Sequence, residues 1–228
     1  MMPCRWSTTR TRCSRRRRSY ATRCSPCRAP SVAHIVALRA FPVGAVIVGA
    51  GAGTRFGEPK ATALLPDGRR FLDAVCAQAL AAGCDPVIAV LPPGVPAPDG
   101  VQVVVNPRAD SEQIASVRLG LARLSNTPCV GVLLWPVDHP FVTLLSVLAV
   151  IDGARLSAAA IVLPQFGERR GHPAYFARDT WRELLTVPDG GARAVIAQRA
   201  ATAGAVMQIP VEDRGVLRDI DTRQDLAG

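Results

Sequence analysis

The chain of 228 residues lacks any apolar run near the roughly 18–20 residues that a membrane-spanning helix needs. The longest candidates, residues 41–52 and 141–151, are too short, so a membrane protein is excluded. Apolar residues nevertheless make up 49% of the chain, which excludes a wholly disordered protein. The length is typical of one domain with a sizeable core.

Acidic residues are absent from residues 1–40, which contain ten arginines. The whole chain has 27 basic and 18 acidic residues and a formal net charge of +9, so residues 41–228 have 17 basic and 18 acidic residues and a net charge of −1. The basic character therefore belongs to the amino-terminal segment alone. We predict that residues 1–40 are a disordered, arginine-rich segment and that residues 41–228 form the working domain.

The amino-terminal segment has several possible interpretations. An arginine-rich arm can bind nucleic acid, a targeting peptide can be rich in arginine and serine, and Cys24 and Cys27 could bind metal. A single C-x-x-C pair is a weak metal signal. We favour a misassigned start codon as the origin of this segment, because terminal segments seldom have structure unless they are tied down. Since Met207 is the one methionine beyond Met1 and Met2, a true start in this region would need a non-Met codon near Val32, Val36 or Val43.

A disulfide framework is also missing. Four of the seven cysteines lie within residues 1–40, which leaves Cys76, Cys84 and Cys129 in the domain. An odd number of cysteines without regular spacing, each in apolar surroundings, predicts buried free thiols in a reducing compartment. We therefore expect a cytoplasmic protein.

From residue 43 onward, short apolar runs alternate with helical patterns. Strands are predicted over 43–48, 86–91, 101–105, 129–135, 159–164, 173–176 and 205–209, and helices over 70–82, 111–124, 141–154, 178–185, 191–203 and after residue 222. Continuous apolarity in the first four runs is typical of strands buried on both faces of a parallel sheet. The alternation predicts a three-layer α/β domain with ligands at the carboxyl ends of its strands.

A glycine-rich loop follows the first predicted strand, where residues 49–60 read GAGAGTRFGEPK. Its glycines let backbone amides approach phosphate. The dinucleotide fingerprint counted from Gly51 would need glycine in place of Phe56, and a Walker A loop would need Ser or Thr after Lys60. The loop and its two cations, Arg55 and Lys60, instead suit a triphosphate.

Lysine is the rarest charged residue, because Lys60 stands alone against 26 arginines. A lysine retained in so arginine-rich a chain suggests a site that needs a compact point charge.

Residues 48–60 are similar to the opening motif of the MobA-like nucleotidyltransferase family, roughly L-A-A-G-x-[GS]-x-R-[FM]-G-x-x-K. Gly49 stands where the family usually has alanine, and residues 61–66 are looser than the family's K-L-L. The resemblance covers about residues 43–228. It implies a Rossmann-like nucleotide-diphospho-sugar transferase fold with a mostly parallel sheet in a single domain.

Two further segments resemble motifs of this family. Asn106-Pro107 with Ser116 is similar to the family's N-P…S-[LV]-R-x-G-L segment, which implies contacts with the base and ribose. Asp138 follows the apolar run 129–135, where a carboxylate is poorly placed for a core and well placed for a metal. It matches the family's [GP]-D-x-P motif, whose aspartate binds Mg²⁺. A simple helix cap is the alternative for Asp138.

The carboxyl-terminal residues 219–226 read DIDTRQDL and resemble the family's D-I-D-T-P-E-D-L ending. The resemblance implies a second metal carboxylate here. Asp221 is our choice for that ligand, with Asp219 as the alternative.

The segment 171–173 reads GHP and follows Arg169 and Arg170. Members of the family that modify the molybdenum cofactor have a similar segment on the acceptor side. Arg170 and His172 could therefore bind a phosphate or carboxylate of the acceptor, while an exposed basic hairpin is the alternative.

Together these features predict an Mg²⁺-dependent nucleotidyltransferase that transfers NMP from an NTP, with CTP favoured, to a phosphorylated acceptor, with release of pyrophosphate. Molybdopterin is the first choice of acceptor, and a sugar, polyol or other small-molecule phosphate is the alternative. An NAD-dependent oxidoreductase and a basic nucleic-acid-binding protein are less favoured. The predicted catalytic residues are Arg55, Lys60 and Asp138; the nucleotide-binding residues are Gly49, Ala50, Gly51, Gly53, Thr54, Arg55, Lys60, Asn106 and Ser116; the metal ligands are Asp138 and Asp221; and the acceptor-binding residues are Arg170 and His172.

Overall fold

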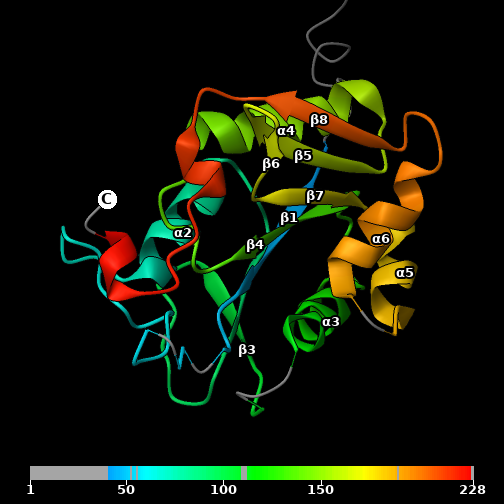
Figure 1. Cartoon of the computed structure of the whole chain (residues 1–228). Coiled ribbons are helices and arrows are strands. Elements are labelled where there is room, and N and C mark those ends of the chain that lie inside the picture. Colours follow the sequence, from blue (N-terminus) through cyan, green and yellow to red (C-terminus); the bar gives the residue numbers. More distant parts are fainter. Residues whose placement is uncertain (1–40, 52, 55, 109–111, 189, 227–228) are drawn as a thin grey trace, which may run out of the picture. The chain divides into compact units, whose positions relative to one another are not determined.

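The computed structural model describes residues 41–226 apart from 52, 55, 109–111 and 189. The predictions for residues 1–40 and for Arg55 therefore lie outside the described residues. The described strands are β1 (Val43–Val48), β2 (Val87–Leu91), β3 (Val101–Val105), β4 (Gly131–Pro136), β5 (Ile161–Phe166), β6 (Arg169–Arg170), β7 (Ala174–Ala177) and β8 (Val206–Pro210). They form one sheet in the order β3-β2-β1-β4-β7-β5-β6, with β8 beside β5 (Figure 1).

The sheet has a parallel part and an antiparallel part. The strands β3, β2, β1 and β4 run parallel to one another. Beyond them β7 is antiparallel to both β4 and β5, whereas β8 is parallel to β5. The predicted mostly parallel sheet is confirmed, and the parallel part places the carboxyl ends of β1 and β4 next to each other.

Helices cover both faces of this sheet, which confirms the three-layer α/β prediction. The described α-helices are α2 (Phe71–Ala81), α3 (Gln113–Leu124), α4 (Leu144–Ser157), α5 (Trp181–Thr186) and α6 (Gly191–Ala200). Buried residues of α2 and α4 pack on one face and those of α3, α5 and α6 on the other, so the sheet separates two apolar clusters (Figure 1). Within β1, Ala45 and Ile47 belong to the first cluster and Val46 and Val48 to the second.

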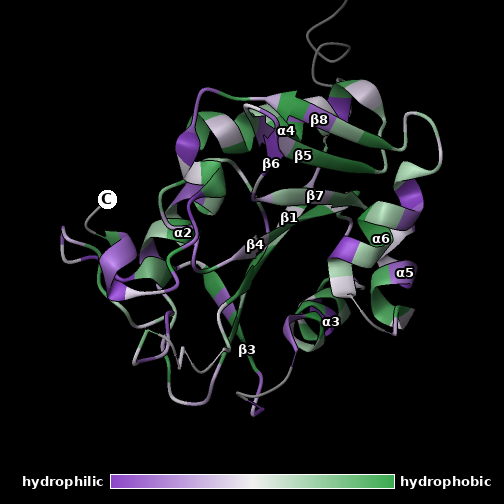
Figure 2. Ribbon diagram, viewed as in Figure 1, coloured by the Kyte–Doolittle hydropathy of each residue, from purple (hydrophilic) through white to green (hydrophobic). Residues whose placement is uncertain are grey.

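Burial of the strands differs from the sequence prediction at β3. Every residue of β1, β2 and β4 is buried, as continuous apolarity predicts. The strand β3 has four valines besides Gln102, but Val103 and Val105 are exposed, because β3 is the edge of the sheet. The prediction of burial on both faces is therefore wrong for β3, since a residue pattern cannot distinguish an edge strand from a central one. Figure 2 shows the green, apolar strands crossing the middle of the fold.

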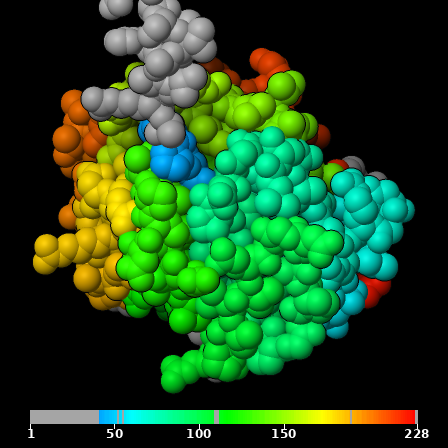
Figure 3. Space-filling model, turned by 180° about the vertical axis from the view of Figure 1, so that it is seen from behind, coloured from blue at the N-terminus to red at the C-terminus, as the bar shows by residue number. Residues whose placement is uncertain are grey.

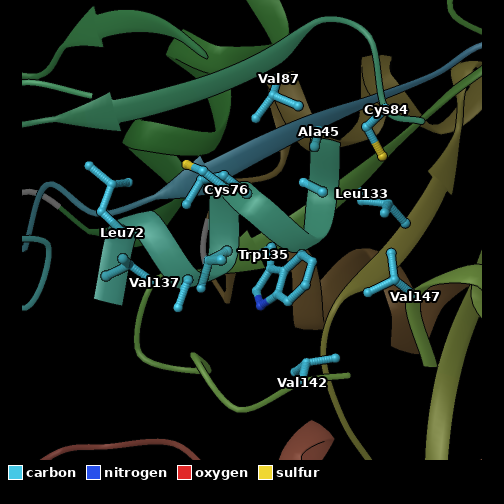
Figure 4. Close-up of a cluster of buried hydrophobic side chains, with 14 of the residues drawn as sticks. Ala45, Leu72, Cys76, Cys84, Val87, Leu133, Trp135, Val137, Val142 and Val147 are labelled. Atoms are coloured by element: carbon cyan, nitrogen blue, oxygen red, sulfur yellow. The ribbon is translucent and has the colours of Figure 1, made fainter. Parts of the chain in front are cut away.

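The predicted buried thiols are confirmed. Cys76, Cys84 and Cys129 are buried and free. Figure 4 shows Cys76 and Cys84 in the cluster that surrounds Trp135, beside side chains from β1, β2 and β4. Burial raises the pKa of Cys76 and of Cys84 to about 12, so both stay as unreactive thiols at neutral pH.

The helix predicted over residues 141–154 begins later, at Leu144. The physical reason lies in the carboxyl-terminal segment, because the carboxylate of Asp213 accepts hydrogen bonds from the backbone N–H and the hydroxyl of Thr143 and from the hydroxyl of Ser146. A residue 70 positions away thus caps α4, and no local pattern predicts such a cap.

Seen from behind, much of the visible surface belongs to the cyan-to-green part of the chain (Figure 3). In the part of the chain that the structure describes, no helix is both long enough and sufficiently apolar to cross a membrane.

Candidate active site

The loops after β1 and β4 meet at the carboxyl edge of the parallel strands. The backbone N–H of Val137 donates to the carbonyl oxygen of Val48 over 3.0 Å, which joins the two loops directly. The glycine loop and Asp138 therefore lie side by side, as the family resemblance implies.

The glycine loop turns at Gly53. Its carbonyl oxygen accepts hydrogen bonds from the backbone N–H groups of Phe56 and Gly57, both at 2.9 Å. Gly53 has φ +62°, and an added Cβ would lie 1.9 Å from the carbonyl oxygen of Glu58, so no other residue fits without moving the backbone.

A cleft of about 250 Å³ opens beside this loop. Its lining includes most of the predicted nucleotide-binding residues, namely Gly49, Gly51, Gly53, Thr54, Lys60 and Ser116, together with Asp138 and Asp221. Ala50 is buried and does not line the cleft. The predicted phosphate-binding residues and predicted metal carboxylates thus share one cavity.

Lys60 joins the two predicted metal ligands. Its ammonium Nζ lies 2.5 Å from Oδ1 of Asp221 and 3.2 Å from Oδ2 of Asp138. The two aspartates are 83 positions apart in sequence, so only the fold brings them onto one cation. We expected Lys60 to neutralise a triphosphate; in the structure it pairs with the two carboxylates.

The electrostatics of this cluster favour the charged forms of Lys60 and Asp138. Burial alone would lower the pKa of Lys60, but hydrogen bonds and charges from Asp221 and Asp138 raise it above its ordinary value. Burial would raise the pKa of Asp138, but the hydrogen bond and charge of His139 and the charge of Lys60 lower it to about 2. At neutral pH Lys60 is therefore an ammonium and Asp138 a carboxylate.

Hydrogen bonds hold both the side chain and the backbone of Asp138 in place. Its Oδ1 lies 3.0 Å from Nδ1 of His139, and the carbonyl oxygen of His139 accepts a hydrogen bond from Nε1 of the buried Trp135. The backbone carbonyl of Asp138 accepts a hydrogen bond from the N–H of Ile220 over 2.9 Å. Ile220 is fully buried, and the residues on either side of it are the two alternatives for the second metal ligand.

The position of the carboxyl-terminal segment separates the side chains of these two aspartates. Asp221 lines the small cleft with Lys60, whereas Asp219 lines a second cavity on the other side of Asp138. The carboxylate of Asp225 accepts hydrogen bonds from the backbone N–H groups of Asp221 and Thr222 and from the Thr222 hydroxyl, which fixes the turn. Asp221 is thus the carboxylate that faces Lys60.

Sequence reasoning missed a second link between this segment and the glycine loop. Arg223 Nη2 lies 2.8 Å from Oε1 of Glu58, and its guanidinium lies 5.5 Å from the centre of the Phe56 ring. Arg223 occupies a position where the family ending has proline. Its departure from the family motif is the signal that could have drawn attention to it.

Asn106 and Ser116 form a buried pair. The side-chain amide of Asn106 donates to the hydroxyl of Ser116 over 3.0 Å, and both side chains are buried. Ser116 lines the nucleotide-side cleft, but Asn106 does not. Asn106 is therefore placed to orient Ser116 from behind.

The second cavity, of about 820 Å³, lies between the sheet, α3 and α6. Both predicted acceptor-binding residues, Arg170 and His172, line it, and so do Asp138 and His139. Asp138 therefore lies where the two cavities meet. The ring of His172 packs edge-on against the ring of His139, with 4.6 Å between centroids.

His172 is an uncharged imidazole in this cavity. Burial, followed by the charge of His139, lowers the pKa of His172 to about 3. Its Nδ1 is buried and has no hydrogen-bond partner among the described residues. A neutral ring provides no positive charge for a phosphate, so the cations of this cavity must come from elsewhere.

Sequence reasoning also missed the contribution of α6. Its amino-terminal turn, including Gly190, Gly191 and Arg193, lines the same cavity. The sequence signal is a Gly-Gly pair before a helix whose first turn contains arginine and no acidic residue.

The fold and the ionic cluster beside the glycine loop place this chain among the nucleotidyltransferases. Comparison with protein families narrows the class: the model of the MobA-like NTP transferase domain matches residues 45–203. The chain therefore belongs to the MobA-like NTP transferase family. This assignment decides against the oxidoreductase and the nucleic-acid-binding alternatives as the primary function.

Solved structures agree with the assignment. The crystal structure of the Rv0371c protein of Mycobacterium tuberculosis is 28% identical, with a TM-score of 0.69, and the match covers 82% of this chain and 95% of that chain. The same protein in complex with manganese matches with 28% identity and a TM-score of 0.65 over 82% and 96% of the two chains.

A 2-C-methyl-D-erythritol 4-phosphate cytidylyltransferase from Thermus thermophilus has the same fold, with 22% identity and a TM-score of 0.59 over 82% of this chain and 96% of that chain. Comparison with curated protein sequences finds no significant match.

Proposed function

We propose that this nucleotidyltransferase works in the cytoplasm with Mg²⁺ and transfers CMP from CTP to the phosphate of molybdopterin. The observation that carries the proposal is the cluster of Lys60, Asp138 and Asp221 beside the glycine loop. It joins a cation suited to phosphate and two carboxylates suited to a metal in a single cavity. The segment 171–173, which resembles cofactor-modifying members of the family, supports the choice of acceptor.

The donor set fits a divalent cation that prefers oxygen. Two carboxylates from separate segments already converge on one positive charge, the Lys60 ammonium, which marks where a cation is stable. Among the described residues no group of three or more His, Cys, Asp and Glu side chains could surround a metal. Mg²⁺ is typically bound through one or two carboxylates and completes its shell with water and substrate phosphates. The manganese complex of the Rv0371c protein supports a divalent metal.

In the proposed reaction, an oxygen of the acceptor's phosphate attacks the α-phosphorus of CTP, a new P–O bond forms, and the bond to pyrophosphate breaks. The glycine loop donates backbone N–H groups to the β- and γ-phosphates. Lys60, once it leaves the carboxylates, neutralises charge on the triphosphate and on the departing pyrophosphate. Asp138 and Asp221 would hold the metal, which polarises the α-phosphate when bound.

The arrangement of the two cavities supports transfer between two bound molecules. Asp138 lies at their junction, with the glycine loop on one side and Arg170 and His172 on the other. A nucleotide in the small cleft and an acceptor in the large cavity would meet beside this carboxylate. Such positioning provides much of the rate enhancement in phosphoryl transfer.

The proposal is tested by pyrophosphate release from each of the four NTPs with Mg²⁺, against molybdopterin and a panel of sugar, polyol and small organic phosphates. We expect release with CTP and molybdopterin. Release with a sugar or polyol phosphate alone would replace molybdopterin by that acceptor. No release with any pair would contradict the proposed reaction.

A further inference from the structure

The large cavity has positively charged side chains in its lining. Arg170, at the end of β6, and Arg193, in the first turn of α6, both line it. Among the described residues, neither guanidinium takes part in a hydrogen bond or ion pair. By contrast Arg199, farther along α6, pairs with Glu183 and Asp179. Two guanidinium groups without such partners are available to pair with an anionic ligand.

The amino end of α6 strengthens this charge. Among the described residues no side chain caps the helix, and its first turn has no acidic residue. The first backbone N–H groups of a helix carry partial positive charge, so an arginine in the first turn is unfavourable unless an anion lies nearby. Gly190 and Gly191 have φ +74° and +54°, and this glycine pair shapes the entry into the helix.

His172 provides an independent sign of a ligand at this place. Its side chain lines the same cavity, and its buried Nδ1 has no hydrogen-bond partner among the described residues. Arg193 lines the same cavity as His172, and its charge contributes to the lowered pKa of His172. Buried polar atoms without partners are rare in native proteins and frequently mark a binding site.

We propose that the amino-terminal turn of α6, with Arg193 and Arg170, binds the phosphate of the acceptor. This inference rests on the proposed function and assigns a residue, Arg193, that the family resemblance did not bring to attention. The carboxylates of Asp138, Asp219 and Glu112 line the same cavity, so the two arginines are the groups that favour an anionic acceptor. The acceptor class that suits them is a phosphate monoester.

The apolar part of the cavity wall indicates the chemistry of the rest of the acceptor. Apolar side chains from both helices and from the sheet line it, namely Ile114, Val117, Leu163, Phe176 and Ile196. An acceptor whose phosphate lies at the amino end of α6 would place an apolar or aromatic ring against this wall. Small polar phosphates would leave most of the 820 Å³ unfilled.

The test measures binding of phenyl phosphate to the full chain saturated with Mg²⁺ and a non-hydrolysable CTP analogue, by calorimetry. We expect Arg193→Gln to weaken phenyl phosphate binding by about tenfold or more, from the loss of charge-assisted hydrogen bonds. Arg193→Lys should recover part of the affinity. Arg182→Gln makes the same charge change at an exposed position of α5 outside the cavity, and this variant should bind phenyl phosphate like the wild type.

The outcomes separate this inference from the proposed function. If the nucleotide analogue binds but phenyl phosphate binds independently of Arg193, or not at all, the α6 subsite is wrong and the proposed function stands. Equal losses in the Arg193 and Arg182 variants would also overturn the subsite, because they would show a general charge effect. If phenyl phosphate binding depends on Arg193 but no nucleotide binds, the subsite stands and the proposed function fails.

Discussion

The two sides of Asp138 differ in how their charges are neutralised. On the nucleotide side Lys60 pairs with Asp138 and Asp221, and Arg223 pairs with Glu58. On the acceptor side, within the described part of the chain, Arg170 and Arg193 have no such partners. The nucleotide side therefore holds its geometry before a substrate arrives, whereas the acceptor side presents charges that a ligand would complete. Substitutions should accordingly affect stability and catalysis on the first side, and mainly acceptor binding on the second.

The largest effect is expected in the shared cluster. Asp138→Ala or Lys60→Ala should lower kcat by about 10²-fold or more, the usual loss when one electrostatic stabiliser is removed. Pyrophosphate release measures the effect. Asp99→Ala, an exposed acidic position outside both cavities, is the control and should keep the wild-type rate. Unchanged release in both site variants would contradict our assignment of the site.

The pH dependence of the unfolding free energy tests how much the ionised Asp138 stabilises the nucleotide side. The pKa of Asp138 is about 2 in the folded chain against an ordinary value of 3.8, so its ionised form stabilises the fold above about pH 4. This contribution, about 2 kcal/mol from the size of the shift, is lost as the pH falls towards 2. Between pH 5 and pH 2 the wild type should therefore lose about 2 kcal/mol more unfolding free energy than Asp138→Asn.

Urea unfolding of both proteins at a series of pH values measures this difference. Parallel stability curves for the two proteins across this range would show that Asp138 is not the titrating group.

A smaller effect is expected where the carboxyl-terminal segment meets the glycine loop. Arg223 is 72% exposed and Glu58 38% exposed, so their ion pair should contribute at most about 1 kcal/mol. Because the pair holds the segment that contains Asp221, Arg223→Met should raise the KM for the nucleotide by about two- to threefold, with kcat nearly unchanged. A double-mutant cycle with Glu58→Gln tests the coupling. Additive effects of the two substitutions would argue against the link.

The smallest change in stability is expected on the acceptor side. Arg170→Gln removes no hydrogen bond or ion pair found among the described residues, so the unfolding free energy should stay within about 0.5 kcal/mol of the wild type. The KM for the acceptor should rise in the same variant. A large loss of stability on thermal unfolding would show that the acceptor side is as internally paired as the nucleotide side, and the comparison would fail.

Much of the fold was predictable because its signals are local. Continuous apolar runs and helical periodicity gave the strands, the flanking helices and the mostly parallel sheet. The exposure of β3 and the late start of α4 were not predictable, since they depend on a strand being at the sheet edge and on a cap from Asp213.

The candidate active site likewise has features that local sequence predicts and features that depend on the fold. Local sequence patterns are enough to recognise which chemistry is present: a glycine loop, a single lysine and isolated carboxylates after apolar strands, each identifiable from a few neighbouring residues. How these groups combine depends on the tertiary structure. It brought Asp221 rather than Asp219 onto Lys60, buried His172 as a neutral ring, and carried Arg193 from a distant helix into the cavity beside Asp138. These outcomes depend on distances between segments far apart in the chain, and such distances exist only once the chain has folded.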